Sequence, residues 1–121
     1  MHNSYKEIFG QGTTLSLTYE YMLSKRETIV KFINEYRPGE IVFVACGSSY
    51  WSSLSSSLTM QRETGIRCSA VKSGDIVLDP DCYARAYNRP LVIAPSRSGH
   101  TSETLIAVEK MKNWYKCPVI T

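Results

Sequence analysis

A run of hydroxyl side chains around one glycine follows a short apolar segment near the C-terminal end of the sequence. Residues 96–104 read Ser-Arg-Ser-Gly-His-Thr-Ser-Glu-Thr, directly after the apolar residues 91–95. A helix that begins after such a loop has unpaired backbone N–H groups, and its dipole favours negative charge at that end. Small hydroxyls add hydrogen-bond donors without filling the space that an anion needs. The pattern indicates an anion-binding loop, and it also fits a loop whose Ser and Thr only cap the next helix.

A second segment of the same kind lies earlier in the sequence. Residues 46–49 read Cys-Gly-Ser-Ser and follow the apolar, β-branched run 41–45, which is typical of a strand buried on both faces. Seven of the ten residues from 48 to 57 are serine, so a flexible linker is an alternative interpretation. Apolar residues at helical spacing within and after this stretch favour a helix instead.

The elements that position these loops follow from hydrophobic periodicity. The pattern predicts an irregular start over 1–14, a loop over 72–80, helices over 16–36, 50–64, 81–87 and 102–115, and strands over 41–45, 66–71, 91–94 and 117–121. Alternating helices and strands indicate an α/β fold with a parallel sheet and helices on both faces. In a flavodoxin-like strand order the first and third strands are neighbours, so both hydroxyl-rich loops open onto one crevice.

Composition excludes several other classes of function. The 121 residues suit one domain, and the net charge of +3 is spread without a basic run, so we expect no nucleic-acid partner. Four widely spaced cysteines and two histidines do not form a zinc motif, and we expect neither a metal nor another cofactor. No stretch resembles an export signal or a membrane span. Three of the cysteines lie in or beside apolar runs, as reduced thiols do, and the two observations together predict a cytoplasmic protein.

The common nucleotide and hydrolase motifs are missing from the sequence. It contains no Gly-x-x-x-x-Gly-Lys-Ser/Thr, no Gly-x-Gly-x-x-Gly after a strand and no Gly-x-Ser-x-Gly. Ser96 or Ser98 as a catalytic nucleophile is a weak alternative, because the sequence positions no His–Asp pair to activate either hydroxyl.

The two loop segments resemble the hallmark motifs of the SIS (sugar isomerase) domain family. Residues 46–50, Cys-Gly-Ser-Ser-Tyr, are close to the first motif in the isomerase half of glucosamine-6-phosphate synthase, and residues 96–104 match the Ser-x-Ser-Gly-x-Thr pattern. The resemblance covers residues 16–121 and implies a flavodoxin-like three-layer α/β/α sandwich. The predicted organisation is therefore an N-terminal extension over 1–15 and the first part of an SIS domain over 16–121.

The resemblance also implies a set of residues that bind the phosphate of a phosphorylated sugar. By motif position, hydroxyl side chains and backbone amides of both loops contact the phosphate: Gly47, Ser48, Ser49, Ser96, Arg97, Ser98, Gly99 and Thr101. Arg97 adds a charge-assisted contact or is a solvated loop side chain. His100 fits a surface loop residue better than a base, and Glu103 fits a helix-start residue better than a catalytic base.

The family implies an aldose–ketose isomerase or an aminosugar-phosphate isomerase or deaminase. Its catalytic glutamate, histidine and lysine match no position here, so we expect an incomplete SIS domain that binds substrate, that is inactive alone and whose catalytic residues lie beyond residue 121. A non-catalytic sugar-phosphate sensor, as found in some transcriptional regulators, is one alternative. The other is a fragment that binds without catalysis and pairs with another copy. The expected partners are a sugar phosphate and a second copy of the chain.

Overall fold

The computed structural model describes residues 3–121, which fall into two units, one up to Arg37 and one from Pro38 onward. The first unit is one long helix, α1 (Asn3–Tyr36). The sequence predicts an irregular start and a helix only from Ser16, and this boundary is wrong for residues 3–15; residues 1 and 2 lie outside the described part. The two glycines in that stretch cost about 0.5–1 kcal/mol each relative to alanine in a helix, which weakens the helix without ending it.

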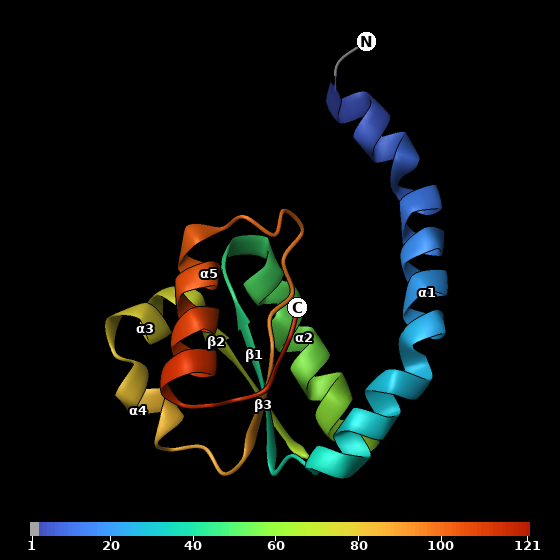
Figure 1. Ribbon diagram of the computed structural model, residues 1–121. Helices are drawn as coiled ribbons and strands as arrows, with labels where there is room; N and C mark the ends of the chain where they lie inside the picture. The colour runs from blue at the N-terminus through green and yellow to red at the C-terminus, as the bar shows by residue number, and fades with distance from the viewer. Residues whose placement is uncertain (1–2) are drawn as a thin grey trace. The chain divides into compact units, whose positions relative to one another are not determined.

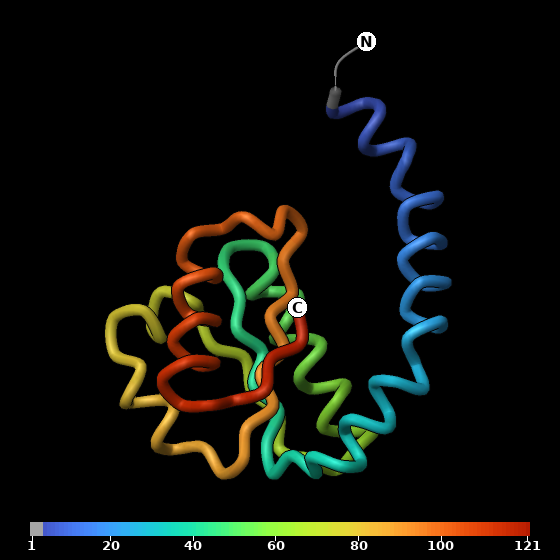
Figure 2. Tube along the Cα trace, viewed as in Figure 1, coloured from blue at the N-terminus to red at the C-terminus, as the bar shows by residue number. Residues whose placement is uncertain are grey.

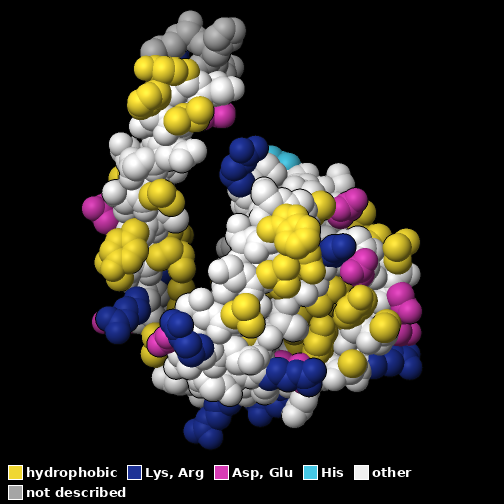
Figure 3. All heavy atoms as spheres, turned by 180° about the vertical axis from the view of Figure 1, so that it is seen from behind, with side chains coloured by type: hydrophobic (Ala, Val, Ile, Leu, Met, Phe, Trp, Pro, Cys, Tyr) yellow, Lys and Arg dark blue, Asp and Glu magenta, His cyan; other side chains and the backbone are white. Residues whose placement is uncertain are grey.

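Helix α1 carries many large hydrophobic side chains that are exposed. Figure 3 shows yellow side chains at several places along the face of the helix that is in view. They are Tyr5, Ile8, Phe9, Leu15, Leu17, Tyr19, Tyr21, Met22, Leu23 and Val30. Aromatic contacts within the helix, such as the stacked rings of Phe32 and Tyr36, join neighbouring turns.

The second unit alternates strands and helices, as predicted (Figure 1). Its elements are β1 (Glu40–Ala45), α2 (Gly47–Thr64), β2 (Arg67–Lys72), α3 (Ser73–Leu78), α4 (Pro80–Ala84), β3 (Pro90–Ile93), α5 (Ser102–Glu109), the π-helix η1 (Lys110–Trp114) and β4 (Val119–Ile120). The strands form one sheet in the order β2-β1-β3-β4, and every neighbouring pair is parallel. This confirms the predicted α/β class and makes β1 and β3 neighbours.

Helices cover both faces of this sheet, with α2 on one side and α3 and α5 on the other (Figure 1). Side chains alternate along a strand, so successive β1 residues belong to different faces. Val42 and Val44 join the core beneath α3 and α5, together with Ile76 of α3 and Met111 of η1. Each of these four side chains is fully buried.

The face of α2 toward the sheet is lined by small residues. Ser53 and Ser57 are its buried residues, and their hydroxyls donate to the backbone oxygens of Ser49 and Leu54 in the same helix. Each hydroxyl is therefore satisfied locally, and the short side chains let the helix backbone lie close to the sheet. The flexible-linker alternative is wrong, because residues 47–64 form one continuous helix.

Two predicted segments on the far side of the sheet differ from the structure. The expected loop over 72–80 contains α3, a helix of six residues that packing stabilises: Ile76 is fully buried, and the Ser73 hydroxyl lies 3.0 Å from that of Thr104 on α5. The expected helix over 102–115 changes at Lys110 into a π-helix. The carbonyl of Met111 there accepts a hydrogen bond from the backbone N–H of Cys117, six residues later.

Candidate functional site

The turn after β1 places the first hydroxyl-rich segment at the carboxyl edge of the sheet. Cys46 is extended, and Gly47 opens α2 with a φ of +56°, a conformation that favours glycine. No hydrogen bond from the Cys46 side chain caps α2. The first-turn N–H groups of α2, which belong to Ser48 and Ser49, have no partner within their own helix.

The loop after β3 is shaped by its own serines. The Ser96 hydroxyl accepts a hydrogen bond from the Gly99 N–H at 3.1 Å, and the Ser98 hydroxyl accepts one from the His100 N–H at 3.2 Å. Gly99 has a φ of +67°, which closes the turn. Thr101 precedes α5, and its hydroxyl makes no capping hydrogen bond. These hydroxyls order the loop rather than cap the helix.

Because β1 and β3 are parallel neighbours, the two loops meet at one edge of the sheet (Figure 2). They enclose an open hollow of about 270 Å³, which we call the loop hollow. It is lined by Cys46, Gly47, Ser48, Ser49, Ser96, Arg97, Ser98 and Thr101. The structure thus brings together seven of the eight sequence-predicted site residues; Gly99 shapes the loop instead. His100 is exposed.

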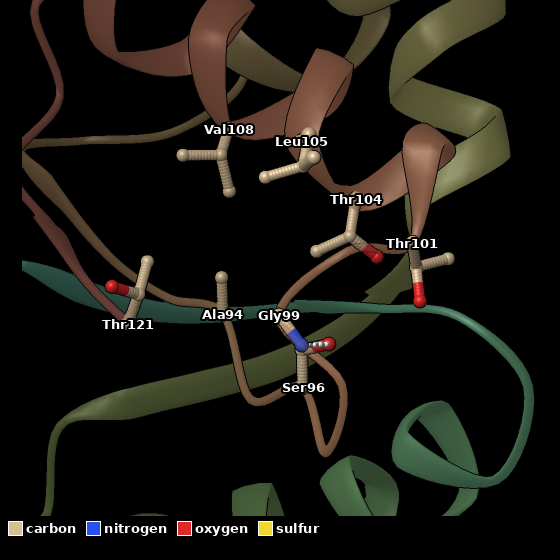
Figure 4. Close-up of a pocket in the computed structure, with 8 residues that line it drawn as sticks. All are labelled: Ala94, Ser96, Gly99, Thr101, Thr104, Leu105, Val108 and Thr121. Carbon is tan, nitrogen blue, oxygen red and sulfur yellow. Dashed lines mark hydrogen bonds between the residues drawn. The ribbon is translucent and has the colours of Figure 1, made fainter.

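A smaller hollow of about 150 Å³ lies between β3 and α5, and Figure 4 shows its lining. Leu105 and Val108 of α5 point into it from one side, and Ala94 and Thr121 lie on the other. Gly99 and Ser96 close it at the end nearest the loop hollow. Its lining combines these apolar side chains with the hydroxyl-bearing residues Ser96, Thr101, Thr104 and Thr121.

A hydrogen bond that the sequence does not reveal joins the residue after β1 to the first turn of α5. The Cys46 thiol donates to Oε2 of Glu103 at 2.9 Å. This bond raises the pKa of Cys46, and desolvation and the negative charge of Glu103 act in the same direction, while a hydrogen bond from the Gly47 backbone lowers it. Glu103 in the first turn of α5 was interpreted only as a helix-start residue; it also ties the end of β1 to α5.

We expect Glu103→Gln to make Cys46 more reactive toward iodoacetamide. Removing the carboxylate charge lowers the thiol pKa, and the thiolate is the species that reacts. The rate at Cys46 is followed by peptide mass spectrometry around pH 8. Cys82 is exposed on α4 and serves as the internal control, whose rate should stay the same in both proteins. An unchanged or slower rate at Cys46 would contradict the role given to Glu103.

A third hollow, of about 330 Å³, lies on the β2 side of the site. Cys46 and Gly47 line both this hollow and the loop hollow, so the two adjoin. We call it the β2-side hollow; its lining is Ala45, Cys46, Gly47, Tyr50, Trp51, Lys72, Ser73, Gly74, Asp75 and Glu103. The Lys72 ammonium lies 5.6 Å from the centre of the Tyr50 ring. The sequence pattern does not predict this part of the site, because residues 72–80 read as a loop and α3 is too short for a helical period to be recognised.

Two further classes of feature are absent from the part of the chain that the structure describes. Across residues 3–121 there is no cluster of three or more His, Cys, Asp or Glu side chains placed to hold a metal ion. Within the same residues, no helix has the length and apolarity needed to cross a membrane.

Known proteins resemble the chain in sequence over most of its length. No family model matches. The glutamine–fructose-6-phosphate aminotransferase (isomerizing) of Sulfolobus acidocaldarius is 31% identical over 112 residues, which cover 92% of this chain and 18% of that protein. The enzyme of the same name from Helicobacter pylori is 32% identical over 111 residues, which cover 88% of this chain and 18% of that enzyme. The chain therefore spans less than a fifth of these relatives.

Solved structures agree on the fold. The tagatose-6-phosphate ketose/aldose isomerase of Escherichia coli superposes with a TM-score of 0.71 at 25% identity, over 83% of this chain and 28% of that one. A provisionally assigned tagatose-6-phosphate ketose/aldose isomerase from Clostridium novyi gives a TM-score of 0.77 at 29% identity. The match covers 95% of this chain and 29% of that chain. Sequence, strand order and these likenesses together show that the chain is similar to the SIS (sugar isomerase) domain family.

Proposed function

We propose that this chain binds a phosphorylated sugar, with the phosphate in the loop hollow. The observation that carries the proposal is that seven of the predicted residues, from two loops about fifty residues apart in sequence, line one open hollow. Hydroxyl groups, the unpaired N–H groups at the starts of α2 and α5, and the positive charge of Arg97 suit a phosphate there. Hydrogen bonds to a charged group contribute about 1.5–3 kcal/mol each.

The names of the similar proteins support a phosphorylated sugar over other phosphate esters. Both enzyme names refer to a 6-phosphate of a ketose or an isomerising activity. In a larger isomerase-type protein, the loops would hold the phosphate while a base moves a proton between C1 and C2, and this holding supplies orientation. This chain's own contribution is the binding step, so we expect binding without turnover from the chain alone.

Calorimetric titration of the chain with fructose 6-phosphate and with fructose tests the proposal. We expect saturable binding of the phosphorylated sugar, none of fructose at the same concentrations, and competition by inorganic phosphate. Affinity should fall when the ionic strength rises, because the phosphate contacts are solvent-accessible. Equal binding of fructose and its phosphate, or binding of neither, would refute a phosphate site in the loop hollow.

A further inference from the structure

The β2-side hollow has a chemistry unlike that of the loop hollow it adjoins. Two carboxylates, of Asp75 and Glu103, and one ammonium, of Lys72, line it. The charged side chains of the lining therefore sum to a net negative charge, which does not favour a phosphate. The loop hollow carries the guanidinium of Arg97 and neutral hydroxyls. A phosphate ester whose anionic end lies in the loop hollow has its uncharged end free to enter the β2-side hollow.

Aromatic rings and carboxylates can both contact a polyol, the rings by packing and the carboxylates by hydrogen bonding. Tyr50 and Trp51 line the β2-side hollow with ring surface, against which the C–H groups of a sugar pack. Carboxylate oxygens accept hydrogen bonds from hydroxyl groups. Trp51 is 67% exposed, so its indole is accessible. The hollow between β3 and α5 has no carboxylate and no aromatic ring in its lining.

We propose that the β2-side hollow binds the polyol end of the phosphorylated sugar, packed against Trp51 and within reach of Asp75. Cys46 and Gly47, which line both hollows, form the boundary between the phosphate and the polyol parts of the site. The inference rests on the proposed function, because it takes the phosphate to lie in the loop hollow. Residues that follow β1 and β2 would then determine which phosphate esters the site accepts.

The fluorescence of Trp51 tests this placement. The sequence contains two tryptophans, so Trp114→Phe leaves Trp51 as the single emitter. Fructose 6-phosphate should shift the Trp51 emission to shorter wavelength, because the sugar covers an exposed indole, and the shift should saturate with the calorimetric Kd. Inorganic phosphate, which fills the loop hollow alone, should leave the emission unchanged. The matched control is Trp51→Phe, in which the similarly exposed Trp114 should show no shift.

A second variant tests the polyol part of the site independently of the phosphate part. Asp75→Asn removes a charged acceptor, and we expect fructose 6-phosphate to bind about 10-fold more weakly while inorganic phosphate binds as before. If fructose 6-phosphate binds by calorimetry but neither the Trp51 emission nor the Asp75→Asn affinity changes, the polyol placement is wrong and the phosphate site stands. If neither ligand binds the unaltered chain, both proposals fail.

Discussion

Ser98→Asp is expected to abolish the binding of fructose 6-phosphate, with an affinity at least 100-fold lower. The substitution places a carboxylate on the loop hollow, in the space proposed for the phosphate. Two like charges about 4 Å apart near a protein surface repel by about 4 kcal/mol, and each 1.4 kcal/mol is a tenfold change in affinity. Calorimetric titration of the variant measures the loss.

The loop should keep its shape in this variant. An aspartate oxygen can accept the hydrogen bond from the His100 N–H that the Ser98 hydroxyl accepts now, since Asp forms the same kind of turn. Ser56→Asp is the matched control, because it adds the same charge to an exposed position of α2 outside the loop hollow. Equal weakening in the two variants would indicate a general charge effect, and unchanged binding in Ser98→Asp would place the phosphate elsewhere.

The largest expected change in stability comes from Ile76→Ala in α3. Ile76 is fully buried in the core beneath α3 and α5, and removing a buried side chain of this size costs about 2–5 kcal/mol. Domains of this size are usually stable by only about 5–15 kcal/mol, so the midpoint of urea unfolding should fall sharply. Circular dichroism during urea titration measures the free energy of unfolding.

Leu78→Ala, in the same short helix, is the control for this prediction. Leu78 is 86% exposed, and a surface substitution of this kind changes stability by about 0.5 kcal/mol or less. Equal losses from Ile76→Ala and Leu78→Ala would mean that α3 does not pack as the structure has it. The comparison also tests an element that the sequence pattern does not predict.

The strands and loops of the site were predictable because their signals are local. The run 41–45 is continuously apolar, and residues that break a strand follow it directly, so both the strand and the start of its loop are visible in the sequence. The same holds for β3 and the loop of residues 96–101. The alternating order of elements predicts parallel strands, and a flavodoxin-like strand order makes β1 and β3 neighbours; the structure confirms both.

The missed features depend on contacts between distant residues. α3 has six residues, too few for a helical period to be recognised, and it is held by Ile76 packing and by the pairing of Ser73 with Thr104. The Cys46–Glu103 hydrogen bond joins residues 57 positions apart. The β2-side hollow is formed by the ends of two strands, β1 and β2, together with the starts of three helices, α2, α3 and α5. No local sequence pattern predicts the short helix, the hydrogen bond or the hollow.

The early start of α1 illustrates a different limit. Residues 1–14 contain Gly10 and Gly12, which favour an irregular start, yet glycine only lowers helix stability by about 1 kcal/mol relative to alanine. A long helix tolerates that cost. Composition near a terminus therefore predicts a helix boundary less well than the sequence Arg37-Pro38-Gly39, directly before which α1 ends at Tyr36.

The π-helix η1 has a consequence for how the length of this chain can change during evolution. A π-turn is closed by i→i+5 hydrogen bonds, so it holds one more residue than an α-turn. Removing one residue from Lys110–Trp114 would restore an α-turn. Because η1 ends before β4 begins, we expect a one-residue deletion within it to leave the pairing of Val92 with Val119 in register.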